Sequence, residues 1–373
     1  MLIVLAAFLI ASGITFISIP AIINLAKQKR LFDEPDLTRK LHHPRIPTLG
    51  GVAIFGGFLI SSIFFFDYAQ GPTLPYAFAS MAILFFTGIK DDIIPLTARK
   101  KFIAQLIAVA IVVFRADIRL TNLYGLAGLE EISYPFSVVF TSIALLGLIN
   151  AFNLIDGING LAGGIALIVG TVFGLLFLSM QAFNLAILSF AMAGACAGFL
   201  YFNFQNRIFM GDTGSLTIGL ISAILAIEFI EINASAQGYL FKSSFAPVFA
   251  LAVLIIPFFD TVRVMLLRIA QGNSPFVGDR NHLHHLLVDS GFKHAQASVS
   301  LYLINLLFIG MAWLGQSLPQ LLLLFCLLSS ATALSMLLYY FKIQREMSKG
   351  DLHPHNSSLS TFKKYREQAL SSK

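Results

Sequence analysis

The feature that most constrains this chain is a succession of long apolar runs separated by short polar segments. The runs cover residues 2–26, 51–66, 76–89, 102–114, 136–151, 161–180, 183–201, 215–230, 245–267, 299–315 and 319–340. About 20 apolar residues in a helix cross the hydrocarbon core of a bilayer. A segment in lipid must also satisfy its own backbone hydrogen bonds, which a helix does. The pattern therefore predicts an all-α polytopic integral membrane protein with about 11 transmembrane helices.

The composition excludes an ordinary soluble protein. Of the 373 residues, 57% are hydrophobic and 12% are charged, whereas soluble domains carry about 25% charged residues. A soluble fold of this length would lack the polar surface needed to cover so much apolar material. The two cysteines, Cys196 and Cys326, both lie in apolar runs, so they do not indicate a disulfide framework.

The positive charges predict how the chain is oriented. Of the 25 lysines and arginines, 22 fall in the segments that would share one side, and only Arg115, Arg119 and Lys242 fall on the other. Lysine and arginine favour the cytoplasmic side, so the N-terminus is predicted outside, in the periplasm, and the C-terminus in the cytoplasm. The net charge of +6 then faces anionic lipid and phosphorylated substrates rather than nucleic acid. We divide the chain into a multi-span membrane domain, 1–341, and a basic, partly disordered cytoplasmic tail, 342–373.

Five polar clusters are not needed to build spans, and all five fall on the predicted cytoplasmic side. They cover residues 39–51, 88–105, 150–160, 209–215 and 274–285. Adjacent carboxylates such as Asp91 and Asp92 repel each other at the end of a span. Mg²⁺ would relieve that repulsion and leave room for substrate phosphates. A solvated pair that merely ends a helix is the alternative.

Two further carboxylates favour the metal-site interpretation. Asp156 and Asp212 lie in glycine-rich turns on the same predicted side as Asp91. Glycines let backbone N–H groups approach an anion, and helix N-termini favour phosphate. Helix capping by Asp212 and Thr213 is a local alternative, although it does not require three acidic turns to gather on one face.

The histidines favour phosphate binding over zinc. His282, His284 and His285 follow Arg280 in one loop, but zinc signatures usually add a cysteine, or a glutamate at helical spacing. Asp260 and Arg263 are spaced as an intrahelical pair that neutralises itself, or they form a wall of the polar site. Pro257 predicts a kink or break in the run 245–267, with its second half lining the groove where a lipid phosphate enters.

The five clusters, in this order and between these spans, resemble the polyprenyl-phosphate N-acetylhexosamine-1-phosphate transferase family. The resemblance covers about residues 27–296. The residues Asp279, Arg280, His282, His284 and His285 favour the branch that uses N-acetylglucosamine over the phospho-N-acetylmuramoyl-pentapeptide branch. Asn159 stands where the family usually has a second aspartate, which puts the usual role of that carboxylate in doubt.

The resemblance implies an enzyme of the bacterial cytoplasmic (inner) membrane whose active site faces the cytoplasm. It would transfer N-acetylglucosamine 1-phosphate from UDP-N-acetylglucosamine to undecaprenyl phosphate, releasing UMP, with Mg²⁺ or Mn²⁺ as cofactor. This step starts the assembly of glycans such as O-antigen, enterobacterial common antigen or teichoic acid. The expected catalytic and metal-binding residues are Asp91, Asp92, Asp156 and Asp212. The expected substrate-binding residues are Lys40, His42, Lys101, Asn150, Asn153, Asn159, Asp279, Arg280, His282, His284 and His285.

Several alternatives remain open from the sequence. The donor could be another UDP-N-acetylhexosamine, the route could be one step or two steps through an aspartyl phosphate, and a homodimer is neither required nor excluded. A membrane transporter is the rival class. Transporters place polar sites near the bilayer midplane, often between repeats, whereas these carboxylates gather at one face.

Overall fold

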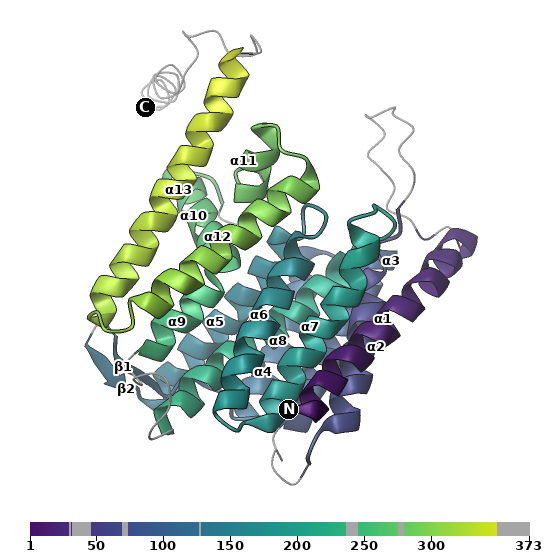
Figure 1. Ribbon diagram of the computed structural model, residues 1–373, viewed down its shortest axis with the longest axis horizontal. Helices are drawn as coiled ribbons and strands as arrows, with labels where there is room; N and C mark the ends of the chain where they lie inside the picture. The colour runs from purple at the N-terminus through teal and green to yellow at the C-terminus, as the bar shows by residue number, and fades with distance from the viewer. Residues whose placement is uncertain are drawn as a thin grey trace.

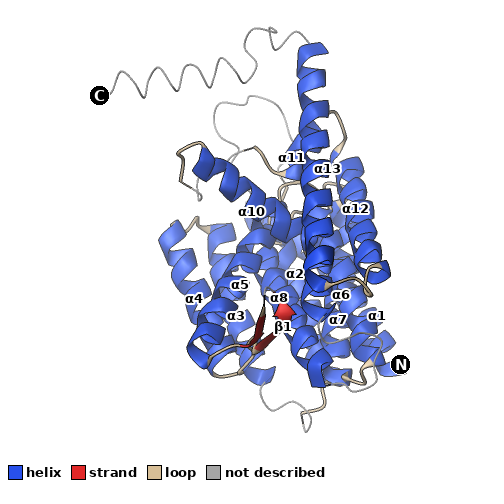
Figure 2. Ribbon diagram, turned by 90° about the vertical axis from the view of Figure 1, so that its left-hand side faces the viewer, coloured by secondary structure: helices blue, strands red, loops and turns tan. Residues whose placement is uncertain are grey.

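The computed structural model describes residues 1–29, 31, 46–68, 74–126, 128–235, 245–274 and 280–348. Over these residues the chain is a helical bundle with one short antiparallel hairpin (Figures 1 and 2). The helices are α1 (Leu2–Lys29), α2 (Gly50–Phe65), α3 (Leu74–Ile93), α4 (Ala98–Phe114), α5 (Tyr134–Ile155), α6 (Leu161–Ser179), α7 (Phe183–Asn203), α8 (Gly211–Ser235), α9 (Ala246–Val253), α10 (Ile255–Ala270), α11 (Leu283–Asp289), α12 (His294–Leu314) and α13 (Gln320–Ser348). The hairpin pairs β1 (Asn122–Leu126) with β2 (Leu129–Glu131).

The predicted fold class, an all-α polytopic membrane protein, is confirmed. Each of the eleven apolar runs forms a helix, except that 245–267 forms the bent pair α9 and α10. Among the described residues, 7 helices are long and apolar enough to span a membrane, and the bent pair makes up to 8. The helix α2 has only 16 residues, and charged residues occupy the facing ends of α3 and α4. Eleven crossings and the orientation therefore stay predictions.

The centre of the bundle is formed by α7 and α8. In these two helices, 78% and 83% of the apolar window is buried by protein, whereas the outer faces of α1 and α13 remain exposed. On one side α1 packs against α7 and α2 (Figure 1). Gly194 of α7 lies so close to the backbone of Phe8 that a Cβ there would collide with the Phe8 carbonyl. Small residues give this close approach between helices in lipid, where packing rather than the hydrophobic effect holds helices together.

The break predicted from Pro257 is confirmed. The helices α9 and α10 meet at Leu254 with a bend of 82°. Proline has no N–H, so the carbonyl four residues earlier, that of Val253, loses its usual helical donor. The side-chain amide of Asn305 on α12 donates to that carbonyl instead, at 3.2 Å.

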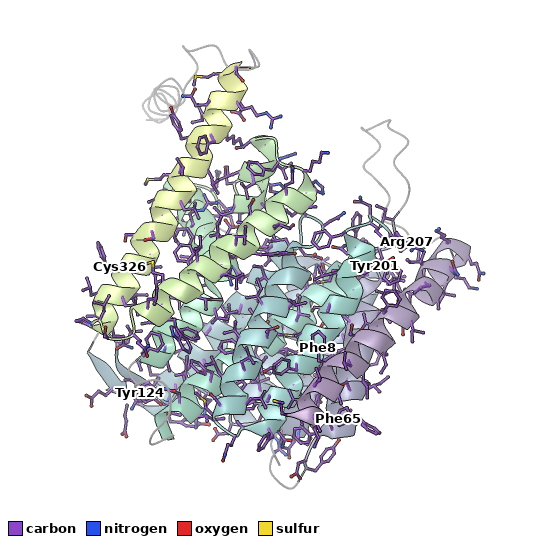
Figure 3. All side chains as sticks on the ribbon, in the orientation of Figure 1. Phe8, Phe65, Tyr124, Tyr201, Arg207 and Cys326 are labelled. Atoms are coloured by element: carbon purple, nitrogen blue, oxygen red, sulfur yellow. The ribbon has the colours of Figure 1, made fainter. Side chains whose placement is uncertain are left out.

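The two ends of the bundle differ. The short helix α11 lies at one end, and the β1–β2 hairpin lies at the other (Figure 1). Arg207 and Tyr201, near the end of α7, are far from Tyr124 of the hairpin (Figure 3). The helix α13 extends past the predicted domain boundary to Ser348, and the rest of the predicted tail lies outside the described residues.

Candidate active site

A cavity of about 760 Å³ lies where several helix ends meet. All four predicted catalytic carboxylates line it: Asp91 and Asp92 at the end of α3, Asp156 after α5, and Asp212 in the first turn of α8. The cavity also contains Asn153 and Asn159 from the predicted set. Three polar residues were not predicted: Thr48, Asn203 and His294. Segments that lie as far apart in sequence as residues 48 and 294 thus build one cleft.

Lys101, at the start of α4, joins two of the carboxylates. Its ammonium lies 2.9 Å from Asp91 Oδ2 and also pairs with Asp212 Oδ2. Asp91 Oδ1 accepts a hydrogen bond from the Leu96 backbone at 2.7 Å, which closes the α3–α4 turn. Because one ammonium contacts both carboxylates, Asp91 and Asp212 lie well within the ~15 Å that a shared metal and phosphate site allows.

Asp92 caps α8 from a different helix. Its Oδ1 accepts the Asp212 N–H at 2.7 Å, and its Oδ2 accepts the Thr213 N–H at 3.0 Å and the Thr213 hydroxyl at 2.5 Å. These are donors that the start of a helix leaves unpaired, and a carboxylate there also complements the helix dipole. The sequence suggested that Asp212 and Thr213 cap this helix themselves. In the structure, the acceptor comes from α3.

Glycines make this approach possible. Gly211 has φ +73°, a conformation that favours glycine, and a Cβ on it would collide with the Thr48 carbonyl and the Asp92 carboxylate. Gly51 and Gly88 likewise leave no room for a Cβ against the first turn of α8. The backbone of 47–51 also exchanges hydrogen bonds with 209–210. The glycine-rich clusters of the sequence therefore form the packing around the start of α8.

The turn 156–160 carries the fourth carboxylate. Asp156 accepts a hydrogen bond from the Gly211 backbone, while desolvation, Asp212 and Asp92 raise the pKa of Asp156 well above its usual range. The Gly160 N–H donates to Asn203 Oδ1 at 2.5 Å, and the Asn203 amide donates to the Ile208 carbonyl at 2.8 Å. From α12, Ser298 donates to the Asn159 carbonyl at 2.7 Å, and the Tyr302 hydroxyl donates to the Gly160 carbonyl. The turn is therefore held by both α7 and α12.

The three predicted asparagines occupy different places. Asn153 donates to Asp212 Oδ1 and to the Ser215 hydroxyl, both at 3.0 Å, so it orients the carboxylate. Asn159 is 7% exposed and its amide pairs with Asn206. Asn150 exchanges hydrogen bonds with Gln105 of α4, at 3.0 and 3.3 Å, outside the cavity lining.

The histidine segment is anchored by Asp260. Its Oδ2 lies 3.0 Å from His282 Nδ1, and its Oδ1 accepts the Leu283 N–H at 3.0 Å and pairs with Arg263 at 2.9 Å. The sequence left open whether Asp260 and Arg263 only neutralise each other. The structure shows that pair and also shows α10 holding the start of α11.

His284 connects this segment to the Asp156 turn. A Cβ at Gly157 would lie 2.5 Å from His284 Nε2, so the ring packs directly against that turn. The ring is 1% exposed, and neither nitrogen has a hydrogen-bond partner among the described residues. Burial lowers the pKa of His284 to about 3, so the ring is neutral at physiological pH and offers one N–H donor and one acceptor.

The remaining predicted residues lie further from the cavity. The Arg280 side chain is 60% exposed and pairs with Asp289 at 3.0 Å, and Asp289 also pairs with Lys342 of α13. His285 is half-buried beside His284. Lys40, His42 and Asp279 lie outside the described residues.

The donor set suits a hard cation that keeps other ligands. Among the described residues, no three His, Cys, Asp or Glu side chains are arranged as a ready-made metal site. Mg²⁺ usually takes one or two protein carboxylates and completes its shell with water and substrate phosphates. Asp92 accepts hydrogen bonds from the start of α8, and Asp91 and Asp212 both pair with Lys101. Asp156 is therefore the least neutralised of the four carboxylates.

Several residues that build the site belong to no recognisable motif in the sequence. Asn203, Ser298 and Tyr302 lie inside or at the end of apolar helices, where a single polar residue is common. His294 begins α12 shortly after the histidine cluster but outside its spacing. A polar residue recurring on one face of α12 was the available clue.

A bundle of membrane-capable helices with a cleft lined by four carboxylates at the helix ends is the arrangement expected of a membrane enzyme that handles a metal ion and phosphate groups. The profile of glycosyl transferase family 4 matches residues 74–230, which includes all four carboxylates. The chain is 31% identical over 295 residues to the undecaprenyl-phosphate alpha-N-acetylglucosaminyl 1-phosphate transferase of Yersinia pestis, covering 77% of this chain and 78% of that protein. It is 32% identical over 286 residues to the protein of the same name from Salmonella typhi, covering 75% of each.

A third relative has a similar name. The chain is 30% identical over 312 residues to the probable undecaprenyl-phosphate N-acetylglucosaminyl 1-phosphate transferase of Bacillus subtilis (strain 168), covering 82% of this chain and 83% of that protein. The chain belongs to glycosyl transferase family 4, and the resemblance found in the sequence is confirmed.

Proposed function

We propose that this protein transfers N-acetylglucosamine 1-phosphate from UDP-N-acetylglucosamine to undecaprenyl phosphate and releases UMP. The observation that carries the proposal is the convergence of Asp91, Asp92, Asp156 and Asp212 on one cleft at one end of a lipid-spanning bundle. The relatives named for this reaction match three quarters or more of the chain.

The chemistry needs little base catalysis. The lipid phosphate is a monoester whose second pKa is about 6, so it is largely dianionic at neutral pH. One of its oxygens bonds to the β-phosphorus of the UDP-sugar while the bond from that phosphorus to the bridging oxygen breaks. UMP leaves with the bonding electron pair. The main obstacle is repulsion between the dianion and the diphosphate, so positioning and positive charge are what the site must supply.

The described residues supply part of the positioning and part of the positive charge. Lys101 brings one positive charge between Asp91 and Asp212. Asn153 orients Asp212, and the Asp260–His282 contact holds His284 against the Asp156 turn.

We propose Mg²⁺ or Mn²⁺ as the cofactor, held by Asp91, Asp92, Asp156 and Asp212. When bound, the cation lowers the repulsion between the two phosphorylated substrates. The crowding of two carboxylates, Asp92 and Asp212, against Asp156 supports this assignment, because a divalent cation would neutralise the excess negative charge. Of the four, Asp156 has the most to gain from a cation, since among the described residues its partner is the Gly211 backbone N–H, whereas each of the others has at least two N–H, O–H or ammonium partners.

We further propose that the cleft faces the cytoplasm of a bacterial inner membrane. The 22-to-3 division of lysine and arginine supports this side. UDP-sugars are made there, and the apolar acceptor reaches the cleft through the bilayer. Its product would start the assembly of a lipid-linked glycan.

UMP release by the purified full chain, with UDP-N-acetylglucosamine, undecaprenyl phosphate and Mg²⁺, tests this proposal. We expect UMP to form only with both substrates present.

Asp212→Asn should lose nearly all activity even in excess Mg²⁺, whereas the exposed Asp117→Asn should not. His282→Ala should lose less, mainly by raising the KM for the UDP-sugar. No UMP from any UDP-N-acetylhexosamine, together with solute uptake into proteoliposomes, would favour a transporter instead.

A further inference from the structure

One face of α12 carries three polar side chains that each reach another segment. Ser298, Tyr302 and Asn305 are spaced by four and then three residues, which places them on the same side of a helix. Ser298 and Asn305 are fully buried. Each of the three donates a hydrogen bond to a backbone carbonyl that does not belong to α12.

Two of these bonds fix the Asp156 turn. Ser298 holds the Asn159 carbonyl at 2.7 Å, and Tyr302 holds that of Gly160. The Tyr302 ring lies in a notch made by Gly160 and Gly164, where a Cβ on Gly164 would collide with the ring. The turn that carries Asp156 therefore cannot shift relative to α12 without losing both bonds and this packing.

The third bond fixes the direction of α10. Asn305 Nδ2 donates to the Val253 carbonyl, the acceptor that Pro257 leaves without a helical donor. This contact lies at the 82° bend between α9 and α10. From there α10 carries Asp260, which binds His282 Nδ1 and the Leu283 N–H at 3.0 Å each. The same α11 start presses His284 against Gly157.

The Asp156 turn, which lines the cleft, and the α10–α11 unit, which packs against that turn through His284, are therefore both tied to α12. We propose that the polar face of α12 is a positioning element that keeps the Asp156 turn and the histidine-bearing α10–α11 unit in register, with Asn305 as the residue that sets the α9–α10 bend. The effect that we expect on turnover rests on the proposed transferase function. The bend itself can be measured without any substrate.

Stability alone does not account for Asn305. Its Oδ1 is buried and has no hydrogen-bond partner among the described residues. Such an atom costs free energy, whereas leucine at the same position would bury only apolar atoms. Asn305→Leu removes the unpaired Asn305 Oδ1 but leaves the Val253 carbonyl without a donor. The two effects oppose each other, so the melting temperature should stay nearly unchanged while the bend between α9 and α10 loosens.

The test compares the full-length chain with Asn305→Leu in the same detergent. Hydrogen exchange followed by mass spectrometry should show the amides of α10 opening about tenfold more often, the size expected when a buried carbonyl loses its donor. The kcat should fall about tenfold with smaller changes in both KM values, because the Asp156 turn and the α10–α11 unit lose their mutual alignment. Ser189→Ala is the matched control, since it removes a buried hydroxyl that bonds only within its own helix.

A second comparison uses Pro257→Ala. An alanine at 257 regains an N–H that can reach the Val253 carbonyl, so adding Asn305→Leu should increase exchange far less in that background than in the wild type. Exchange in α10 that is unchanged by Asn305→Leu would overturn the proposal. So would a loss of melting temperature with kcat per folded molecule unchanged. If the chain released no UMP at all, the proposed function would fail, while the exchange measurements would still decide the role of Asn305.

Discussion

The Asp156 carboxylate is the least compensated charge in the cleft. Desolvation and the neighbouring Asp212 and Asp92 carboxylates raise its pKa well above the usual range. A carboxyl whose pKa is raised on folding stabilises the fold only while it is protonated. That contribution is complete below its unfolded value of about 3.9 and is lost as pH rises through the raised value.

Asp156→Asn should therefore stabilise the protein when divalent cations are removed. At pH 7.5 in EDTA we expect the melting temperature to rise by about 2–4 °C, which corresponds to ~1 kcal/mol in a domain of more than 150 residues. The difference should shrink as the pH is lowered toward 4. Excess Mg²⁺ should stabilise the wild type more than the variant. If the variant melts no higher than the wild type in EDTA at pH 7.5, the Asp156 carboxylate is not destabilised by its neighbours and the prediction is wrong.

Gly157 makes room for His284, so its substitution is a direct test of that contact. A Cβ on Gly157 would lie 2.5 Å from His284 Nε2, and the buried ring has little space to move. Gly157→Ala should lower transferase activity about tenfold and also lower the melting temperature.

Gly147→Ala on α5 is the matched control, because a Cβ there meets nothing within 4 Å. It should be neutral or slightly stabilising, as alanine favours a helix over glycine. If the clash is the cause, Gly157→Ala should cost less stability in a His284→Ala background than in the wild type. Equal costs in the two backgrounds would remove His284 from the explanation.

At the scale of elements, α10 combines a buried polar face with an apolar outer face. Asp260 is 1% exposed, whereas Phe258 and Leu266 are 36% and 61% exposed. Because of the 82° bend at its start, α10 does not continue the direction of α9, so the two helices do not form one straight membrane span. These features support the hypothesis that it borders the path of the lipid phosphate.

Pro257→Ala should impair the use of polyprenyl phosphate more than the use of the UDP-sugar. Restoring the N–H at 257 lets α9 and α10 approach a continuous helix, which would move the outer face of α10. Separate titrations of the two substrates would give both KM values. A variant with unchanged kinetics for both would leave Pro257 as a bend that only packs against its neighbours.

At the scale of the whole molecule, the charge distribution predicts which end faces the cytoplasm. The cleft and α11 lie at one end, and the hairpin region with Arg115 and Arg119 lies toward the other. Cysteine labelling with a membrane-impermeant maleimide can test this in cells, in a Cys326→Ser background; the other native cysteine, Cys196, is buried.

Asp117→Cys should be labelled from outside intact spheroplasts. Lys293→Cys, beside the cleft, should be labelled only after the membrane is permeabilised. Both positions are exposed, so access to the reagent rather than burial decides the result. The reverse pattern would invert the proposed orientation.

The sequence by itself determined the features that depend on local patterns. Apolar runs specified the helices because a lipid-spanning segment must satisfy its backbone internally. Pro257 specified the break because proline removes a helical donor wherever it stands. The alternation of the runs placed Asp91, Asp92, Asp156 and Asp212 at one end, and the structure brings all four to one cavity.

Only the tertiary structure decided what each polar side chain does. Asp92 caps a helix that starts about 120 residues later, Lys101 joins two carboxylates from different helices, and Ser298 holds a turn 139 residues earlier. The packing that brings these groups together is set by glycines and side-chain shapes spread over many helices. A hydrogen bond between residues so far apart leaves no spacing or period in the sequence, because its geometry exists only once the helices have packed.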